Sequence, residues 1–279
     1  MNESQFKAIE NFRKEYKTKC DEWSALCDEL IPLQKSAAQK DTPPYPVQTP
    51  VVYNRALNEI TQDGEIRLIV IGDNPGKDEQ LEKNNRYLVG QSGKIAEGFF
   101  RKNPALGIQF RENAIILNKT PIHTAKTSHL KFLAKNSERA AQLILQSQIW
   151  LAQKTAQLHK ALVAAAQQDD KSHKNADKKN LCELWMVGYA ELKPKGIFVP
   201  YRDALLEEYR AEKKCGAENA ESCAAWERVF VYQHFSMNRF LIDLKEFSGA
   251  KDCAAFEETS LKKNLEALGT KHRREIFGE

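Results

Sequence analysis

The sequence predicts an α/β protein with three layers, α/β/α, built on a four-stranded parallel sheet and carrying an N-terminal helical extension. Two observations lead to this prediction. Four short apolar runs occur along the chain, at residues 67–71, 114–117, 184–187 and 229–232, and the first is rich in β-branched residues. Helical patterns separate these runs, and apolar strands that alternate with helices are typical of a parallel sheet covered on both faces.

The N-terminal part is expected to be a helix followed by an extended connector. Over residues 4–31, apolar residues recur at spacings of three and four, which gives one apolar face. Residues 41–50, DTPPYPVQTP, contain four prolines and no periodicity. We therefore expect residues 1–50 to form a helix with its proline-rich connector and residues 51–279 to form the main domain.

Further helices are expected between and after the strands. Ser92 is a candidate cap for a helix through Phe100. The longest helical pattern covers residues 136–166 and is followed by a polar loop at 167–180. Two more helices are expected at 238–247 and 255–268.

Composition limits the class of protein. The 279 residues suffice for one large domain, and the net charge of +4 is only mildly basic. The N-terminus has no apolar signal region, and no apolar run is long enough to span a membrane. None of the six cysteines forms a CxxC pair. We therefore expect a cytoplasmic monomer with reduced cysteines, no membrane partner, no metal ion and no other cofactor.

Polar residues follow three of the predicted strands. Asp73 and Asn74 follow the first, Asn118 the second, and His234 and Ser236 the last. Each alone is best explained as a turn or capping residue. However, a parallel sheet brings its carboxyl ends to one edge, where ligands bind in open α/β sheets. Convergence of three segments favours a site with a carboxylate, amides and an imidazole.

These residues also lie in motifs that resemble a known family. The segment GDNPGKDEQ, followed by RYLVGQSG, resembles the first motif of the uracil-DNA glycosylase superfamily, Gly-x-x-Pro-Gly with a later Val-Gly-x-Ser/Ala-Gly. Asn118 after AIIL resembles the uracil-reading Asn of that family, and His234-Phe235-Ser236 resembles its His-Pro-Ser motif. In outline the resemblance covers roughly residues 66–247.

The resemblance implies hydrolysis of the N-glycosidic bond of uracil in DNA, after the nucleotide has flipped out of the duplex. Asp73 matches the acidic residue of the thermostable branch, and Asn74 matches the water-positioning residue of the mismatch-specific branch, so both stay candidates. Asn118 would read the uracil edge, and His234 would stabilise the leaving anion. The remaining substrate-binding candidates are Gly72, Pro75, Gly76, Tyr87, Leu88 and Ser236.

DNA contacts are expected directly after the last motif. Met237 is a candidate wedge that fills the vacated base stack, with Asn238 and Arg239 beside it. A core position at the start of a helix explains Met237 equally well.

The chain departs from the family pattern at three places. Phe235 replaces the family's Pro, and Leu88 stands where a stacking aromatic residue is expected, with Tyr87 as its neighbour. No Cys occurs between residues 28 and 181, so no iron–sulfur cluster is expected. Two alternatives therefore stay open. One is a DNA-binding protein of the same fold without turnover, and the other is a small-molecule, nucleoside-binding hydrolase.

Overall fold

The fold is a three-layer α/β/α sandwich, as the sequence predicts. The computed structural model describes residues 1–172, 181–214, 224–249 and 258–279. All strand pairs in the sheet are parallel, and their order is β2-β1-β3-β4. The strands are β1 (Leu68–Gly72), β2 (Ala114–Asn118), β3 (Glu183–Val187) and β4 (Val229–Tyr232).

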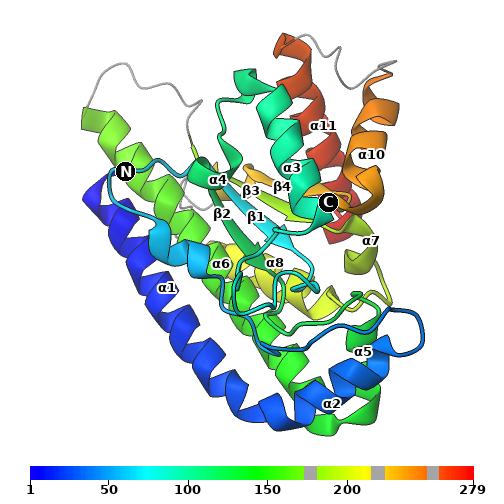
Figure 1. Ribbon diagram of the computed structural model, residues 1–279. Coiled ribbons are helices and arrows are strands. Elements are labelled where there is room, and N and C mark those ends of the chain that lie inside the picture. The colour runs from blue at the N-terminus through cyan, green and yellow to red at the C-terminus, as the bar shows by residue number, and fades with distance from the viewer. Residues whose placement is uncertain (173–180, 215–223, 250–257) are drawn as a thin grey trace.

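Each face of the sheet packs against its own set of helices (Figure 1). Leu68 and Val70 of β1 lie in one apolar cluster with α3 (Gln91–Lys102), α10 (Arg239–Ser248) and α11 (Glu258–Phe277). The alternate residues Ile69 and Ile71 lie in a second cluster with α6 (Glu138–Ser172) and α8 (Val199–Lys214). Because both faces are covered, the middle residues of every strand are apolar.

The N-terminal extension packs onto the helical layer formed by α6. α1 (Glu3–Trp23) lies along α6, and α2 (Cys27–Ala38) contacts α5 (His129–Asn136) (Figure 1). A short 3₁₀ turn, Ser24–Leu26, divides the predicted helix, which then continues past the predicted end at residue 31. Buried residues of α1 share one core cluster with β1. The core is therefore continuous across residue 50, where the extension was expected to end.

Other helix boundaries differ from the predicted ones. α5 and α8 were not predicted, and α11 runs to Phe277 instead of residue 268. α3 begins two residues earlier than a helix capped by Ser92 would, with Gly90 at its N-cap. Shorter helices are α4 (Phe110–Asn113) and α7 (Tyr189–Leu192). The predicted loop beyond Ser172 and the predicted helix start at residue 255 lie outside the described residues.

Two further expectations concern membranes and cysteines. Across the described ranges, no helix is both long enough and apolar enough to cross a membrane. Cys20, Cys27 and Cys182 are free thiols. The other three cysteines lie outside the described residues.

The strand order fixes where a site is expected. From β1 the chain continues to β2 on one side, whereas β3 pairs with β1 on the other side. A ligand crevice in an open parallel sheet lies at such a switch point, beyond the carboxyl ends of the strands. The segments that follow Gly72 of β1 and Val187 of β3 are therefore central to the site.

Candidate active site

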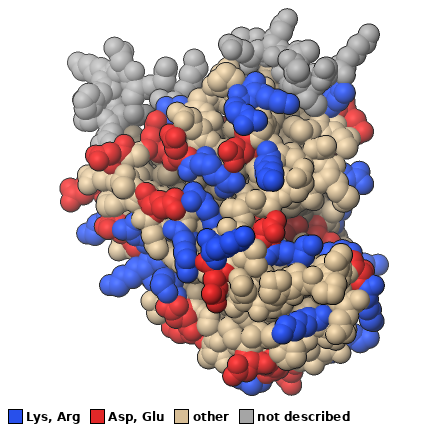
Figure 2. All heavy atoms as spheres, viewed as in Figure 1, with Lys and Arg blue, Asp and Glu red and all other residues tan. Residues whose placement is uncertain are grey.

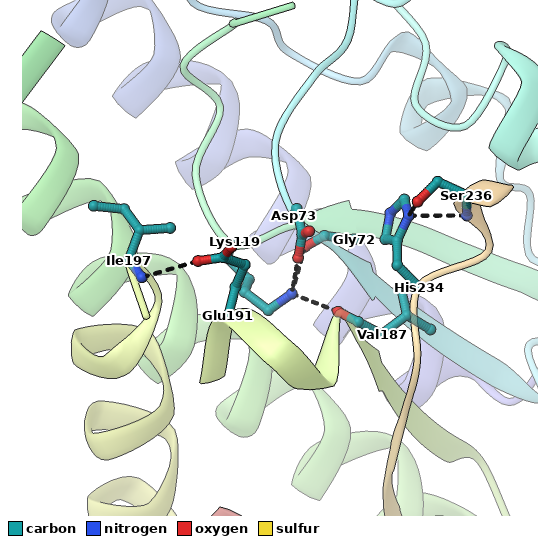
Figure 3. Close-up of polar contacts among 8 residues, drawn as sticks. All are labelled: Gly72, Asp73, Lys119, Val187, Glu191, Ile197, His234 and Ser236. Carbon is teal, nitrogen blue, oxygen red and sulfur yellow. Dashed lines mark hydrogen bonds and ion pairs between the residues drawn. The ribbon is translucent and has the colours of Figure 1, made fainter. Parts of the chain in front are cut away.

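A cleft of about 510 Å³ opens beyond the carboxyl ends of β1, β3 and β4. Asp73, Gly188 and His234, which follow these three strands, all line it, and so do Ser236 and Met237. The sheet therefore brings together Asp73 and His234, which are 161 residues apart in the sequence. Figure 3 shows the two side chains at one edge of the sheet, beyond β1 and β4, which lie on either side of β3.

Lys119, which sequence reasoning did not select, anchors Asp73. Its Nζ donates to Asp73 Oδ1 at 2.7 Å, to the Val187 carbonyl at 2.6 Å and to the Gly72 carbonyl at 3.2 Å. The Lys119 side chain has no exposed surface, whereas that of Asp73 is 12% exposed. Burial lowers the pKa of Lys119, and the Asp73 carboxylate opposes that shift. The pair therefore places a fixed carboxylate at the cleft surface (Figure 3).

Gly188 leaves room for that carboxylate. Its φ of +97° is in the left-handed region that disfavours L side chains. A Cβ added there would come within 2.2 Å of Asp73 Oδ1. Only glycine therefore allows β3 to end beside the Asp73–Lys119 pair.

His234 has a defined tautomer. The backbone N–H of Ser236 donates to His234 Nδ1 at 3.1 Å, and Ser236 Oγ lies 2.8 Å from the same nitrogen (Figure 3). Nδ1 is therefore an acceptor, and the proton of the neutral ring is on Nε2. Burial lowers the pKa of His234, Asp73 raises it and Lys119 lowers it. Phe235, in place of the expected Pro, is fully buried and packs on Phe240 at 4.9 Å between ring centroids.

Asn118 is buried beside Gly72. The two residues are paired in register at the ends of β2 and β1. Asn118 is 2% exposed, and its Nδ2 has no hydrogen-bond partner among the described residues. A buried donor without a partner costs about 1–3 kcal/mol. The described residues that line the cleft do not include Asn118, so its contact with a base stays a prediction.

Gly72→Ala is expected to displace this amide, because a Cβ at residue 72 would come within 2.3 Å of Asn118 Oδ1. We expect the free energy of unfolding to fall by about 1–3 kcal/mol, as for other overpacked sites. Urea unfolding measures this change. Gly76→Ala is the matched control, since a Cβ there meets no atom within 4 Å. An equal loss of the free energy of unfolding in both variants would contradict the expected clash with Asn118.

Asn74 and its loop neighbours have structural partners. Asn74 Nδ2 donates to Thr124 Oγ1 at 2.8 Å, and the described residues that line the cleft do not include Asn74. The Pro75 carbonyl accepts from His123 Nδ1 at 2.9 Å, and His123 Nε2 lies 2.9 Å from the Tyr45 hydroxyl. The connector of the N-terminal extension therefore supports the loop that holds Asp73.

Tyr87 and Leu88 are both buried. The Tyr87 hydroxyl donates to the Val52 carbonyl and lies 2.6 Å from that of Tyr16 in α1, and Tyr87 has no exposed surface. In this structure Tyr87 is thus a core residue, and its contact with a base stays a prediction. Leu88 is 4% exposed, with a φ of +52°.

Glu79 connects Leu88 to the glycine loop. Its carboxylate accepts from the backbone N–H of Gly76 at 3.0 Å and of Leu88 at 2.8 Å. Burial raises the pKa of Glu79 to about 7, although these two hydrogen bonds lower it. Sequence reasoning did not select Glu79, because acidic residues in a polar segment are usually exposed.

The segment after Ser236 presents an apolar side chain to solvent. Met237 is 77% exposed, the largest exposed fraction among the large apolar residues described as exposed. Met237 and Asn238 have φ values of +51° and +56°, which L residues rarely adopt. Arg239 begins α10 and lines the cleft. Strained backbone that exposes an apolar residue beside a cleft is typical of a functional site.

The cleft contains more negative than positive residues. Four carboxylate residues line it against one Arg, Arg239; they are Asp73, Glu191, Asp243 and Glu246. Figure 2 shows Lys and Arg interspersed with Asp and Glu over the face it presents. Among the described residues, no group of three or more His, Cys, Asp or Glu is arranged to hold a metal ion. The side chains that line the cleft include the Asp73 carboxylate and the His234 imidazole.

Comparisons of the chain with protein-family models, with curated proteins and with solved structures find no match.

Proposed function

We propose that this protein hydrolyses the N-glycosidic bond of deoxyuridine in DNA and releases uracil. The observation that carries the proposal is that an anchored carboxylate, Asp73, and a neutral imidazole, His234, line one cleft. Such a reaction needs stabilisation of a cationic sugar and of an anionic base at the same time. The motif resemblance supplies the identity of the base.

In the proposed reaction, Asp73 stabilises a developing positive charge and His234 stabilises a developing negative charge. As the C1′–N1 bond breaks, its electron pair moves into the uracil ring and leaves a positively charged sugar. Asp73 stabilises the sugar and orients a water molecule, whose oxygen bonds to C1′ while its proton is lost to the carboxylate or to solvent. The Nε2–H of His234 donates to uracil O2 as negative charge develops there.

Asn118 supplies discrimination. Its unpaired Nδ2 can donate to uracil O4, and its Oδ1 can accept from N3–H. Cytosine carries an amino group in place of O4 and has no hydrogen on N3, so both contacts would be lost. A buried amide left unpaired disfavours the wrong base strongly.

The proposed enzyme is monofunctional and acts without a covalent intermediate on lysine. Lys119 is the lysine bonded to Asp73, but its ammonium donates to three acceptors and has no exposed surface. An amine nucleophile needs a free lone pair and access to C1′. Water is therefore the nucleophile in this proposal.

Uracil release tests the proposal. The protein is incubated with single-stranded and duplex oligonucleotides that contain one uracil, and free base is quantified. We expect release from the uracil substrates and none from matched oligonucleotides with cytosine at that position. Absence of release from every uracil substrate would contradict the proposal.

Met237→Ala is expected to lower the rate on duplex DNA about tenfold, which corresponds to about 1.4 kcal/mol. The exposed side chain would replace the flipped base in the stack, a role that single strands do not require. We expect the single-strand rate to change less than about twofold and the free energy of unfolding less than about 0.5 kcal/mol.

Single-turnover rates on both substrates measure this difference. Leu145→Ala is a matched control, because Leu145 is an exposed apolar residue on α6. An equal loss of rate on single-stranded and duplex DNA would contradict the role of Met237 as a wedge.

A second candidate function is hydrolysis of free nucleosides. The four carboxylates of the cleft favour it, because they repel a phosphate-rich strand and do not repel a neutral nucleoside. Incubation with deoxyuridine separates the two functions. Release from deoxyuridine but not from oligonucleotides would favour the nucleoside hydrolase, and the reverse would favour the glycosylase.

A further inference from the structure

We infer that Lys119 is a positioning residue that holds Asp73 with one carboxylate oxygen bonded inside the protein and the other directed to the cleft. Its effect on catalysis rests on the proposed glycosylase function. The anchoring of Asp73 does not depend on that function.

The Lys119 ammonium connects the ends of three strands. Lys119 follows β2 directly, and its acceptors are the Gly72 carbonyl of β1, the Val187 carbonyl of β3 and the carboxylate of Asp73 (Figure 3). An ammonium has three N–H groups, and all three have acceptors here. The Phe198 ring covers the group, with Nζ 4.9 Å from its centroid. The ammonium is therefore fixed in place and has no bond left for a ligand.

This arrangement makes the two oxygens of Asp73 different. Oδ1 accepts from the Lys119 ammonium, which has no exposed surface, so this hydrogen bond lies inside the protein. No donor among the described residues is paired with Oδ2, while Asp73 lines the cleft. The terminal torsion of an Asp is broad unless a contact restricts it. The bond to Lys119 thus restricts the carboxylate to one orientation.

Orientation matters for the rate more than for binding. A catalytic group must be held within about 0.5 Å of its productive position, and displacement by about 1 Å can lower a rate about 100-fold. Lys119 lies behind Asp73 and has no exposed surface through which to contact a substrate. Its loss is therefore expected to affect the chemical step through Asp73.

A double-mutant cycle tests this inference. Lys119→Met is expected to lower the single-turnover rate of uracil release about 100-fold, with oligonucleotide affinity unchanged. In the Asp73→Asn background, Lys119→Met should cause no further loss, since the negative charge whose position Lys119 fixes is gone. Lys154→Met is the control, because it removes a lysine of α6 that pairs with Glu15 of α1 at 2.7 Å and does not line the cleft. If the rate of the double variant falls by the product of the two single losses, Lys119 acts independently of Asp73 and the inference is wrong.

A measurement that needs no activity distinguishes this failure from failure of the glycosylase proposal. In protein with ¹⁵N-labelled lysine, the buried ammonium should give a slowly exchanging Nζ resonance that Lys119→Met removes. Asp73→Asn should shift or broaden it, and Asn74→Ala should leave it unchanged. A resonance that is insensitive to Asp73 overturns the inference, whatever the activity. A resonance that depends on Asp73 in a protein without uracil release would support the anchor and reject the glycosylase.

Discussion

Replacement of Asp73 by Asn is expected to lower the single-turnover rate of uracil release about 10³-fold, the loss typical of removing one group that stabilises developing charge. The Asn side chain keeps the size of the Asp and can still accept from Lys119. It has no negative charge with which to stabilise the cationic sugar, and it cannot take a proton from water. Rapid-quench measurement of free uracil, with enzyme in excess, gives the rate.

Asn74→Ala is the matched variant in the same loop. Its Nδ2 donates to Thr124 Oγ1 at 2.8 Å, so the side chain supports the loop without lining the cleft among the described residues. We expect a loss smaller than about tenfold in the same assay, which corresponds to about 1.4 kcal/mol. A larger loss for Asn74→Ala than for Asp73→Asn would assign the water to Asn74 and contradict the assignment to Asp73.

Acidification is expected to destabilise the fold through His159. Burial lowers its pKa from 6.5 to about 4, while its ring is paired with the Tyr209 hydroxyl at 2.6 Å and the Cys182 carbonyl at 2.9 Å. Between these two pH values the unfolded chain binds a proton that the folded protein does not. The free energy of unfolding therefore falls as pH drops from 6.5 to about 4, by about 3 kcal/mol for this residue.

Urea unfolding at several pH values in this window checks the contribution of His159. His159→Gln should reduce the slope of stability against pH by up to about 1.4 kcal/mol per pH unit, the value for one proton. Tyr209→Phe is the control, since it removes one hydrogen bond and keeps the titrating ring. The same slope in His159→Gln and in the wild type would show that His159 does not bind the proton.

The sheet could be predicted because its signal is local. Each strand contains a short apolar run buried on both faces, and the polar residues after these runs had to meet at one edge. That reasoning identified Asp73, His234 and Ser236, which line one cleft. It could not separate Asp73 from Asn74, because the difference depends on Thr124, 50 residues further on.

The buried positions of Lys119 and Tyr87 could not be predicted, because both depend on partners that are distant in the sequence. A lysine in a loop is usually exposed, and only the strand order brings Lys119 to the ends of β1 and β3. Tyr87 pairs with Tyr16 of the N-terminal helix, and nothing in either segment alone indicates that partner. The apolar face of residues 4–31 predicted the helix but left open whether it packs on the main domain or projects from it, and the structure shows that it packs on α6.

The most direct test of the central claim is the product balance on one uracil-containing single-stranded oligonucleotide under single-turnover conditions. The proposed mechanism predicts free uracil and an abasic strand in equal amounts from the wild-type protein, with a rate that falls about 10³-fold in Asp73→Asn. An intact oligonucleotide after prolonged incubation, together with salt-sensitive binding of the strand, would contradict catalysis at Asp73 and His234 and indicate a DNA-binding protein instead.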